Sequence, residues 1–180
     1  MSERVPEGWT KSKLSSVAVL EYGKSPNSVK DENGQYPIIG TSGLVGNATD
    51  FIWDKTSVVI GRKGTINKPI YINTPFWAID TTYFCKFLEK THPKWFFYMI
   101  CEEALEKHNE ASGVPSLSRE TLKSIQLKIP PLPEQKKIAS ILTSVDEVIE
   151  TTQKQIDKLQ DLKKATMNEL LTKGIGHTEF

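Results

Sequence analysis

Residues 128–172 read KIPPLPEQKKIASILTSVDEVIETTQKQIDKLQDLKKATMNELLT, and after Pro133 neither proline nor glycine occurs until Gly174. Proline suits the first turn of a helix, because its missing N–H would be unpaired there. Glycine is common just past the last helical residue. The stretch therefore predicts one helix of about 39 residues, roughly 58 Å long at about 1.5 Å per residue.

The apolar residues of this helix recur at alternating intervals of four and three, which is typical of a coiled coil. The repeat runs through Ile138, Leu142, Val145, Ile149, Thr152, Ile156 and Leu159. A surface helix packed on its own domain is the alternative, but a small domain cannot cover so long a stripe. We therefore expect pairing with a second helix, from another copy or from a repeat of this unit. The expected dimer or partner interface comprises Leu132, Ile138, Ile141, Leu142, Val145, Ile149, Ile156 and Leu159.

Length and composition indicate a single core with an appendage, because 180 residues do not suffice for two large domains. No apolar run approaches membrane-spanning length, and the N-terminus lacks the apolar segment of a signal peptide. Cys85 and Cys101 form no disulfide framework and have no zinc-site spacing, and the histidines are too isolated to bind a metal. We expect a cytoplasmic protein without a metal site.

The part before the long helix reads as an α+β domain. Apolar, β-branched runs at residues 58–60 and 70–72 predict a hairpin, residues 77–87 predict another strand pair, and residues 38–39 and 125–129 predict further strands. A helix is expected over residues 94–109, and Trp9 is expected in the core. The fold prediction is a globular domain with a mixed or antiparallel sheet over residues 1–130. The long helix, expected in an antiparallel coiled coil, then covers residues 131–173, and residues 174–180 form a tail or linker.

Charge argues against DNA binding by bulk electrostatics, since the net charge is only +1. Within residues 51–73, however, four basic residues face the single acid Asp54. Arg62 and Lys63 occupy the glycine-flanked tip of the predicted hairpin, where an arginine could grip a phosphate or a guanine edge. Lys24 in a turn-rich loop is equally consistent with a phosphate contact or with plain solvation.

Three glycines lie in residues 40–46, but no Lys-Ser or Lys-Thr pair follows as in a nucleotide-binding loop. The loop reads instead as a place where backbone can approach a ligand closely, although a plain turn explains it as well. If the chain binds DNA, the candidate residues are Lys24, Thr41, Ser42, Asn47, Lys55, Arg62, Lys63, Lys68 and Asn73.

The sequence shows no recognisable set of catalytic residues. Asp80 is a lone carboxylate without an evident partner for acid–base chemistry. No cofactor-binding glycine fingerprint, ATP-binding loop or Asn/Asp-Pro-Pro-Tyr/Phe motif occurs. These absences favour a protein that recognises a ligand over one that transforms it.

The sequence resembles the specificity subunits of Type I restriction-modification systems. Residues 129–142 (IPPLPEQKKIASIL) with Val145 and Asp146, residues 115–122 (PSLSRETL), residues 5–9 (VPEGW) and residues 174–180 (GIGHTEF) carry this resemblance. It spans the chain but is specific at the start and in the last third. It implies a half-length subunit with a single target-recognition domain, either natural or the truncated first half of a longer chain.

The resemblance also implies partners. They are double-stranded DNA, methyltransferase subunits docking near residues 132–142, and a restriction subunit joining through them. S-adenosylmethionine and ATP would reside on those subunits, with no cofactor in this chain. A homodimer through antiparallel long helices would place two domains about one DNA turn apart, roughly 34 Å, on a split palindrome. The alternatives are a coiled-coil interaction module without DNA binding and, less in keeping with the missing constellations, an unrelated enzyme.

Overall fold

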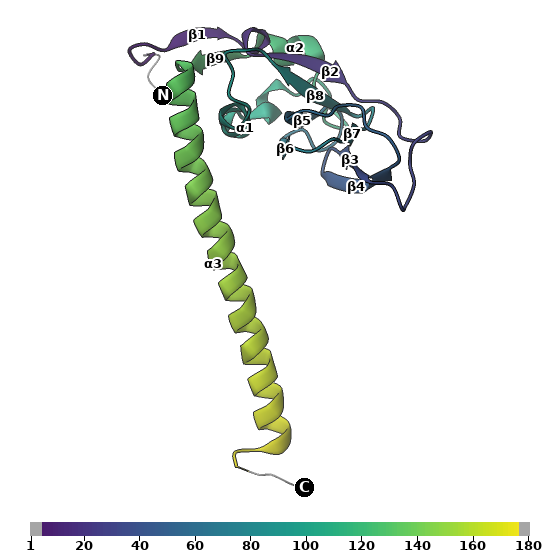
Figure 1. Cartoon of the computed structure of the whole chain (residues 1–180), viewed down its shortest axis with the longest axis vertical. Coiled ribbons are helices and arrows are strands. Elements are labelled where there is room, and N and C mark those ends of the chain that lie inside the picture. The colour runs from purple at the N-terminus through teal and green to yellow at the C-terminus, as the bar shows by residue number, and fades with distance from the viewer. Residues whose placement is uncertain (1–4, 177–180) are drawn as a thin grey trace. The chain divides into compact units, whose positions relative to one another are not determined.

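The computed structural model describes residues 5–176, which divide into two compact units, Met1–Ala139 and Ser140–Phe180 (Figure 1). The first unit is a domain of short strands and short helices together with the opening turns of a long helix. The second is the remainder of that helix. Residues 177–180, which close the predicted tail, lie outside the described part.

A four-stranded antiparallel sheet forms the centre of the first unit. Its order is β2 (Ala18–Tyr22), β8 (Thr82–Phe87), β5 (Ser57–Gly61) and β6 (Ile70–Ile72). Every residue of β5 is buried, as expected for an apolar, β-branched central strand. The pairing of Val58 with Tyr71 confirms the predicted hairpin.

The main core joins this sheet to α1 (Pro93–Glu102) and α2 (Arg119–Ser124) through Val58, Ile60, Phe96, Ile100 and Leu122. The prediction of one helix over residues 94–109 was wrong in its extent. The helix ends at Glu102, the next residue Glu103 adopts an extended conformation, and a 3-10 turn follows at Leu105–His108. That break lets Leu105 turn into the core, where it is 1% exposed.

A second, three-stranded sheet has the order β4 (Gly43–Ala48), β3 (Tyr36–Gly40) and β7 (Trp77–Ala78), with β3 and β7 parallel. Residues 77–87 were expected to hold paired strands, yet β7 and β8 belong to different sheets. The chain changes sheets within residues 79–81, because Ile39 and Val59 offer separate pairing edges to β7 and β8.

A third sheet pairs β1 (Thr10–Lys13) with β9 (Gln126–Ile129), and a 3-10 turn at Leu14–Ser16 follows β1. Trp9 was predicted in the core, which was wrong. It is half-buried, and its Nε1 donates to Glu134 Oε2 at 3.1 Å in the first turn of the long helix. The α+β class is therefore confirmed, with three small sheets in place of the single expected one.

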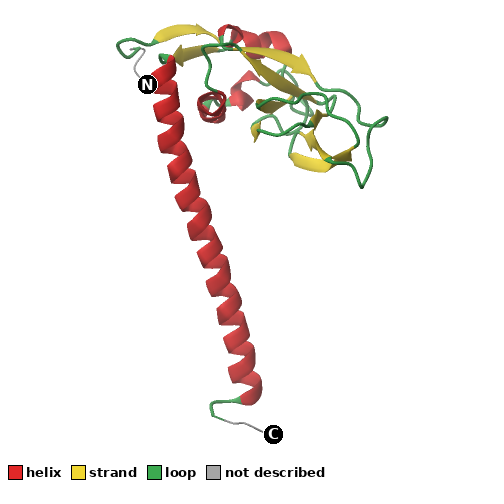
Figure 2. Cartoon of the chain, in the orientation of Figure 1, coloured by secondary structure: helices red, strands yellow, loops and turns green. Residues whose placement is uncertain are grey.

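The long helix α3 (Leu132–Lys173) is continuous over 42 residues, as Figure 2 shows. It begins one residue before Pro133 and ends at Lys173. The next residue, Gly174, has a φ of 71°, which suits a residue without a side chain. In its opening turns Gln135 and Ala139 are buried, and Ile138 packs on the domain core. Pairing of α3 with a second helix stays a prediction.

Candidate nucleic-acid interface

The segment of residues 78–81, which runs from the last residue of β7 to the start of β8, brings together basic residues that lie far apart in the sequence. The backbone N–H of Lys24 donates to Ala78 O at 2.9 Å. On the other side, the N–H groups of Arg62 and Lys63 donate to Thr81 O at 2.8 and 3.3 Å. Three of the predicted DNA-binding residues therefore share one anchoring segment.

Thr41 joins the same region from the second sheet. The parallel pairing of β3 with β7 continues to Ile79, whose N–H donates to Ile39 O at 3.1 Å. A Cβ built on Gly64 would lie 3.8 Å from Thr41 Oγ1, so Thr41 borders the hairpin tip. Ser42 follows Thr41 in the exposed β3–β4 turn. We call Lys24, Thr41, Ser42, Arg62 and Lys63 the turn cluster.

Glycines make the close backbone approaches of the turn cluster possible. A Cβ on Gly23 would lie 2.0 Å from Ile79 O, and a Cβ on Gly61 would lie 2.0 Å from Thr65 O. Neither position has room for a side chain without movement of main chain. From the sequence, close backbone approach is expected only in the 40–46 loop.

Other predicted residues lie elsewhere. Lys55 and Asn73 flank the far end of the β5–β6 hairpin, where Ser57 pairs with Ile72. The five residues of β5 separate that end from Arg62 by roughly 16 Å at about 3.3 Å per residue. Lys68 is exposed in the loop on the tip side of the same hairpin.

The side chain of Asn47 stabilises its own loop. It lies near the opposite end of β4 from Ser42, and its side-chain amide donates to Glu32 O at 3.2 Å. That bond closes the 31–34 turn, where Gly34 N–H donates to Asp31 O at 3.0 Å. The structure thus gives this amide an intramolecular partner.

Two residues that the sequence analysis missed border the turn cluster. Tyr22, at the end of β2, is 43% exposed, and the guanidinium carbons of Arg119 and Arg62 lie 4.8 and 5.6 Å from its ring centroid. Main-chain hydrogen bonds hold the segment before Arg119 against the hairpin tip. Leu117 N–H donates to Arg62 O, and Gly64 N–H donates to Pro115 O, both at 2.9 Å. Only this long-range pairing reveals Arg119, since locally it reads as the first residue of a short helix.

The Tyr22 ring contacts the ring of Tyr83, with the centroids 5.1 Å apart and the planes tilted by 54°. Burial, and secondarily the neighbouring Tyr22, raise the pKa of Tyr83 to about 12. Its hydroxyl donates to Leu117 O at 3.1 Å. The partner of the Tyr22 ring is therefore a neutral, hydrogen-bonded tyrosine that also holds the segment carrying Arg119.

Negative charge near this surface is limited. Asp80 is exposed on the anchoring segment, and Glu110 lies beside Arg119, where its Oε1 accepts hydrogen bonds from Ser118 N–H at 3.4 Å and from the Thr121 hydroxyl. Glu120 lies 2.9 Å from Lys123 Nζ, and the hydrogen bond and charge of that lysine lower the pKa of Glu120. Lys24, Arg62, Lys63 and Arg119 thus outnumber the acids, and the surface suits an anion.

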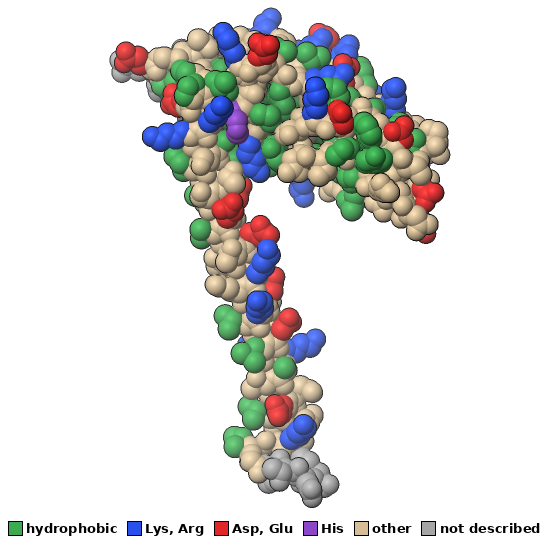
Figure 3. Space-filling view, viewed as in Figure 1, with side chains coloured by type: hydrophobic (Ala, Val, Ile, Leu, Met, Phe, Trp, Pro, Cys, Tyr) green, Lys and Arg blue, Asp and Glu red, His purple; other side chains and the backbone are tan. Residues whose placement is uncertain are grey.

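Along α3, the predicted interface residues from Ile141 onward are exposed, as Figure 3 shows by the hydrophobic side chains along one edge of the helix. Ile138 differs because it packs on the domain core, and Leu132 is half-buried. Val148 and Leu162, which the sequence analysis left out, are 65% and 62% exposed and widen the apolar stripe.

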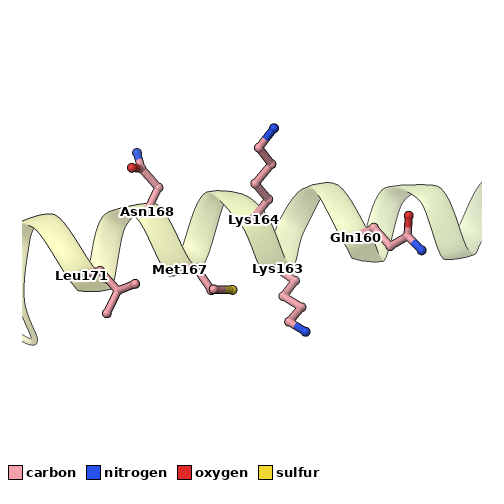
Figure 4. A pocket seen from close by; sticks show the side chains of 6 residues that line it. All are labelled: Gln160, Lys163, Lys164, Met167, Asn168 and Leu171. Carbon is pink, nitrogen blue, oxygen red and sulfur yellow. The ribbon is translucent and has the colours of Figure 1, made fainter.

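Near the end of α3, a shallow groove is lined by residues of this one helix (Figure 4). Figure 4 shows Met167 and Leu171 pointing the same way as the stem of Lys163. The groove is thus part of the helix surface and not an enclosed cavity.

Within residues 5–176, no group of three or more His, Cys, Asp or Glu side chains is placed to hold a metal ion. No helix in the same range combines the length and the apolar character needed to cross a membrane.

Comparison with known proteins gives a consistent family. Residues 6–161 match the family described as the Type I restriction modification DNA specificity domain. The chain is 28% identical over 196 residues to the Type I restriction enzyme MjaVIII specificity subunit of Methanocaldococcus jannaschii, covering 96% of this chain and 44% of the relative. It is 24% identical over 173 residues to the EcoDI specificity subunit of Escherichia coli, covering 94% and 38%.

Solved structures show the same fold. An S subunit of a Type I restriction-modification system from M. genitalium matches with a TM-score of 0.71 at 17% identity, covering 94% of this chain and 47% of that one. The HsdS subunit from Thermoanaerobacter tengcongensis matches with a TM-score of 0.66 at 16% identity, covering 96% and 47%. The chain spans about half the length of the relatives it matches.

Proposed function

The chain belongs to the family of Type I restriction modification DNA specificity domains, and from that membership we propose that it recognises one half of a split DNA target. It does so without catalysing a reaction on the DNA itself. The observation that carries this proposal is the turn cluster, where residues from three separate parts of the domain converge on one anchoring segment. Family membership indicates that the ligand is DNA, and the turn cluster is a surface suited to binding it.

The cluster combines groups that DNA binding needs. Lys24, Arg62 and Lys63 offer positive charge for phosphates, which supply most of the affinity of DNA-binding proteins. Thr41 and Ser42 offer short hydroxyl groups at an exposed turn. Phosphate contacts set register on the duplex, while base contacts choose the sequence. We assign the cations of the cluster to the first role.

Partners follow from the family relation. A matching structure with a TM-score of 0.73 carries the description "Structural basis underlying complex assembly and conformational transition of the type I R-M system". We propose that this chain likewise assembles with methyltransferase subunits, which carry S-adenosylmethionine, and through them with an ATP-dependent restriction subunit. The chain itself would hold no cofactor.

The apolar stripe of α3 supports a paired form. Ile149, Ile156 and Leu159 are 62%, 42% and 64% exposed in the single chain, and such a stripe gains stability when a second helix covers it. We propose an antiparallel homodimer in which two helices act as a spacer. Two identical domains would then read a palindromic target in two parts.

The test is DNA selection with the purified full chain, alone and with its methyltransferase subunit. Random-sequence duplexes are selected for binding, and affinity for the selected duplex is measured over a salt series. We expect a recurrent half-site, present twice in inverted orientation, and an affinity that falls as salt rises. If no sequence is enriched and binding is absent at low salt in both preparations, the chain is an interaction module and not a DNA reader.

A further inference from the structure

We propose that Arg62 and Arg119, held on the ring of Tyr22, form a single two-arginine site that binds one phosphate of the DNA backbone. The inference rests on the proposed function and adds a residue, Arg119, and a role to it. The site would position the domain on the duplex and would not choose the base sequence.

The first observation that supports the site is that the two arginine side chains meet at one aromatic ring. Both guanidinium carbons lie within cation–π distance of the same ring, at 4.8 Å for Arg119 and 5.6 Å for Arg62. The hydrogen bond from Leu117 N–H to Arg62 O, 2.9 Å long, ties the two segments together next to both side chains. The spacing of the two charges is therefore set by main chain and by a shared aromatic support.

The second support is unused hydrogen-bonding capacity. A guanidinium carries five N–H donors. Among the described residues, no carboxylate forms an ion pair with Arg62. Arg119 Nε is buried without a hydrogen-bond partner, and its ion pair with Glu120 Oε1 is long, at 3.9 Å. That same oxygen is 2.9 Å from Lys123 Nζ, so its charge is shared.

The third support is charge balance. Two guanidiniums on one ring repel each other, and the negative face of Tyr22 offsets only part of that repulsion. A phosphate between them would neutralise both and could accept paired N–H bonds from each planar fork. A phosphate group is the anion that double-stranded DNA presents at every step of its backbone.

The partial burial of both arginine side chains favours a contact to phosphate over a contact to bases. The side chain of Arg119 is only 35% exposed, and Arg62 is half-buried. Side chains that lie against a ring at the domain surface have less freedom to extend into a groove toward base edges than exposed arginines on a loop. They suit the outer, phosphate-lined boundary of the duplex.

The experiment measures affinity of the full chain for a random-sequence duplex over a salt series. The variants are Arg62→Ala, Arg119→Ala, Arg119→Lys, the Arg62→Ala/Arg119→Ala double variant and the charge control Lys107→Ala, an exposed lysine. Thermal denaturation checks that each variant is folded, and Arg119→Lys keeps the test decisive if the alanine variant is not.

We expect each arginine-to-alanine change to weaken binding roughly tenfold at low salt. We also expect the double variant to lower the slope of log affinity against log salt by about one, the contribution of a single phosphate contact, and each single variant to lower it by less. Arg119→Lys should keep the slope, because it keeps the charge, but bind less tightly, because the planar fork is gone. The double variant should lose less than the product of the two single losses, because both side chains hold the same phosphate.

Different failures separate the two proposals. If the wild-type chain shows no salt-dependent binding, either alone or with its methyltransferase subunit, both fall. If it binds but the arginine variants behave like Lys107→Ala, the two-arginine site is wrong while DNA recognition stands. Strictly multiplicative losses in the double variant would mean two separate contacts and would also overturn the single site. A changed sequence preference in selection would make the arginines base readers and would overturn the positioning role.

Discussion

Gln135 accepts a hydrogen bond through its side-chain oxygen from the backbone N–H of His92 at 2.8 Å, across 43 residues of sequence. Its side-chain N–H₂ donates to Lys90 O at 3.1 Å and to Pro130 O at 3.0 Å. The residue is 1% exposed, so these bonds are shielded from water. One buried amide thus joins the first turn of α3 to the loop that precedes α1.

Replacing Gln135 with Leu should destabilise the domain. The change leaves one N–H and two carbonyl groups without their partner, and each unsatisfied buried group costs about 1–3 kcal/mol. Allowing for relaxation, we expect the free energy of unfolding to fall by about 2–4 kcal/mol in chemical denaturation. Gln153→Leu, on the exposed part of α3, is the matched control and should change it by less than about 0.5 kcal/mol. Equal effects in both variants would disprove the role of the buried amide.

His92 should make stability depend on pH. Burial, and secondarily the positive charge of Lys136, lower the pKa of His92 below its usual 6.5. The unfolded chain therefore binds this proton more tightly than the folded one, and stability falls as the pH drops through and below that value. Protonation would also remove the Nδ1 acceptor that caps α1 by bonding Trp95 N–H at 3.4 Å.

His92→Asn keeps a capping acceptor but removes the titrating group. Between pH 7 and about 5, we expect the melting temperature of the wild type to fall more than that of this variant. Parallel curves for the two proteins would show that His92 does not contribute to the pH dependence.

Gly61 should tolerate no side chain. The Cβ of alanine would meet Thr65 O at 2.0 Å, so the hairpin tip would have to shift. We expect Gly61→Ala to lower the free energy of unfolding by at least about 1–3 kcal/mol, the usual range for overpacking. Because Arg62 is the next residue, DNA affinity should fall as well. Gly113→Ala, with no atom within 4 Å of the added Cβ, is the control. A loss no larger than that of the control would contradict the close approach.

Ile149→Lys should abolish the proposed dimer. Ile149 lies on the apolar stripe, and burying its side chain contributes about 1.5–3 kcal/mol per helix, which a charged side chain would forfeit. Sedimentation over a concentration series should show a dimer for the wild type and a monomer for the variant. Glu147→Lys adds the same side chain two residues away, off the four–three repeat, and should remain dimeric. A wild-type chain that stays monomeric over the whole concentration series would contradict the proposed homodimer.

Much of the fold could be predicted because its signals are local. The hairpin around Arg62 and Lys63 and the strands at residues 38–39 and 125–129 follow from short apolar runs between turn residues. Local signals also misled. The pattern over residues 94–109 reads as one helix, but the burial of Leu105 outweighs helix continuity at Glu103. Residues 77–87 look like one strand pair, but each half finds a better partner in a different sheet.

The candidate site could be predicted only in part for the same reason. Basic and glycine-rich composition singled out Arg62 and Lys63, which lie in the turn cluster. It also singled out Lys55, at the far end of the hairpin, and Asn47, whose amide closes its own loop. Composition reports that a residue is polar and lies in a loop. It carries no information about which loops meet.

The sequence by itself determined the long helix, its apolar repeat and the family, which the comparison with known proteins confirms. These follow from periodicity and motifs along a contiguous stretch, where each residue acts on neighbours three or four positions away. Only the tertiary structure decided that Tyr22, Arg62 and Arg119 meet. Their contact depends on strand pairings between segments tens of residues apart, and such pairings are selected by burial of the whole core rather than by any local pattern.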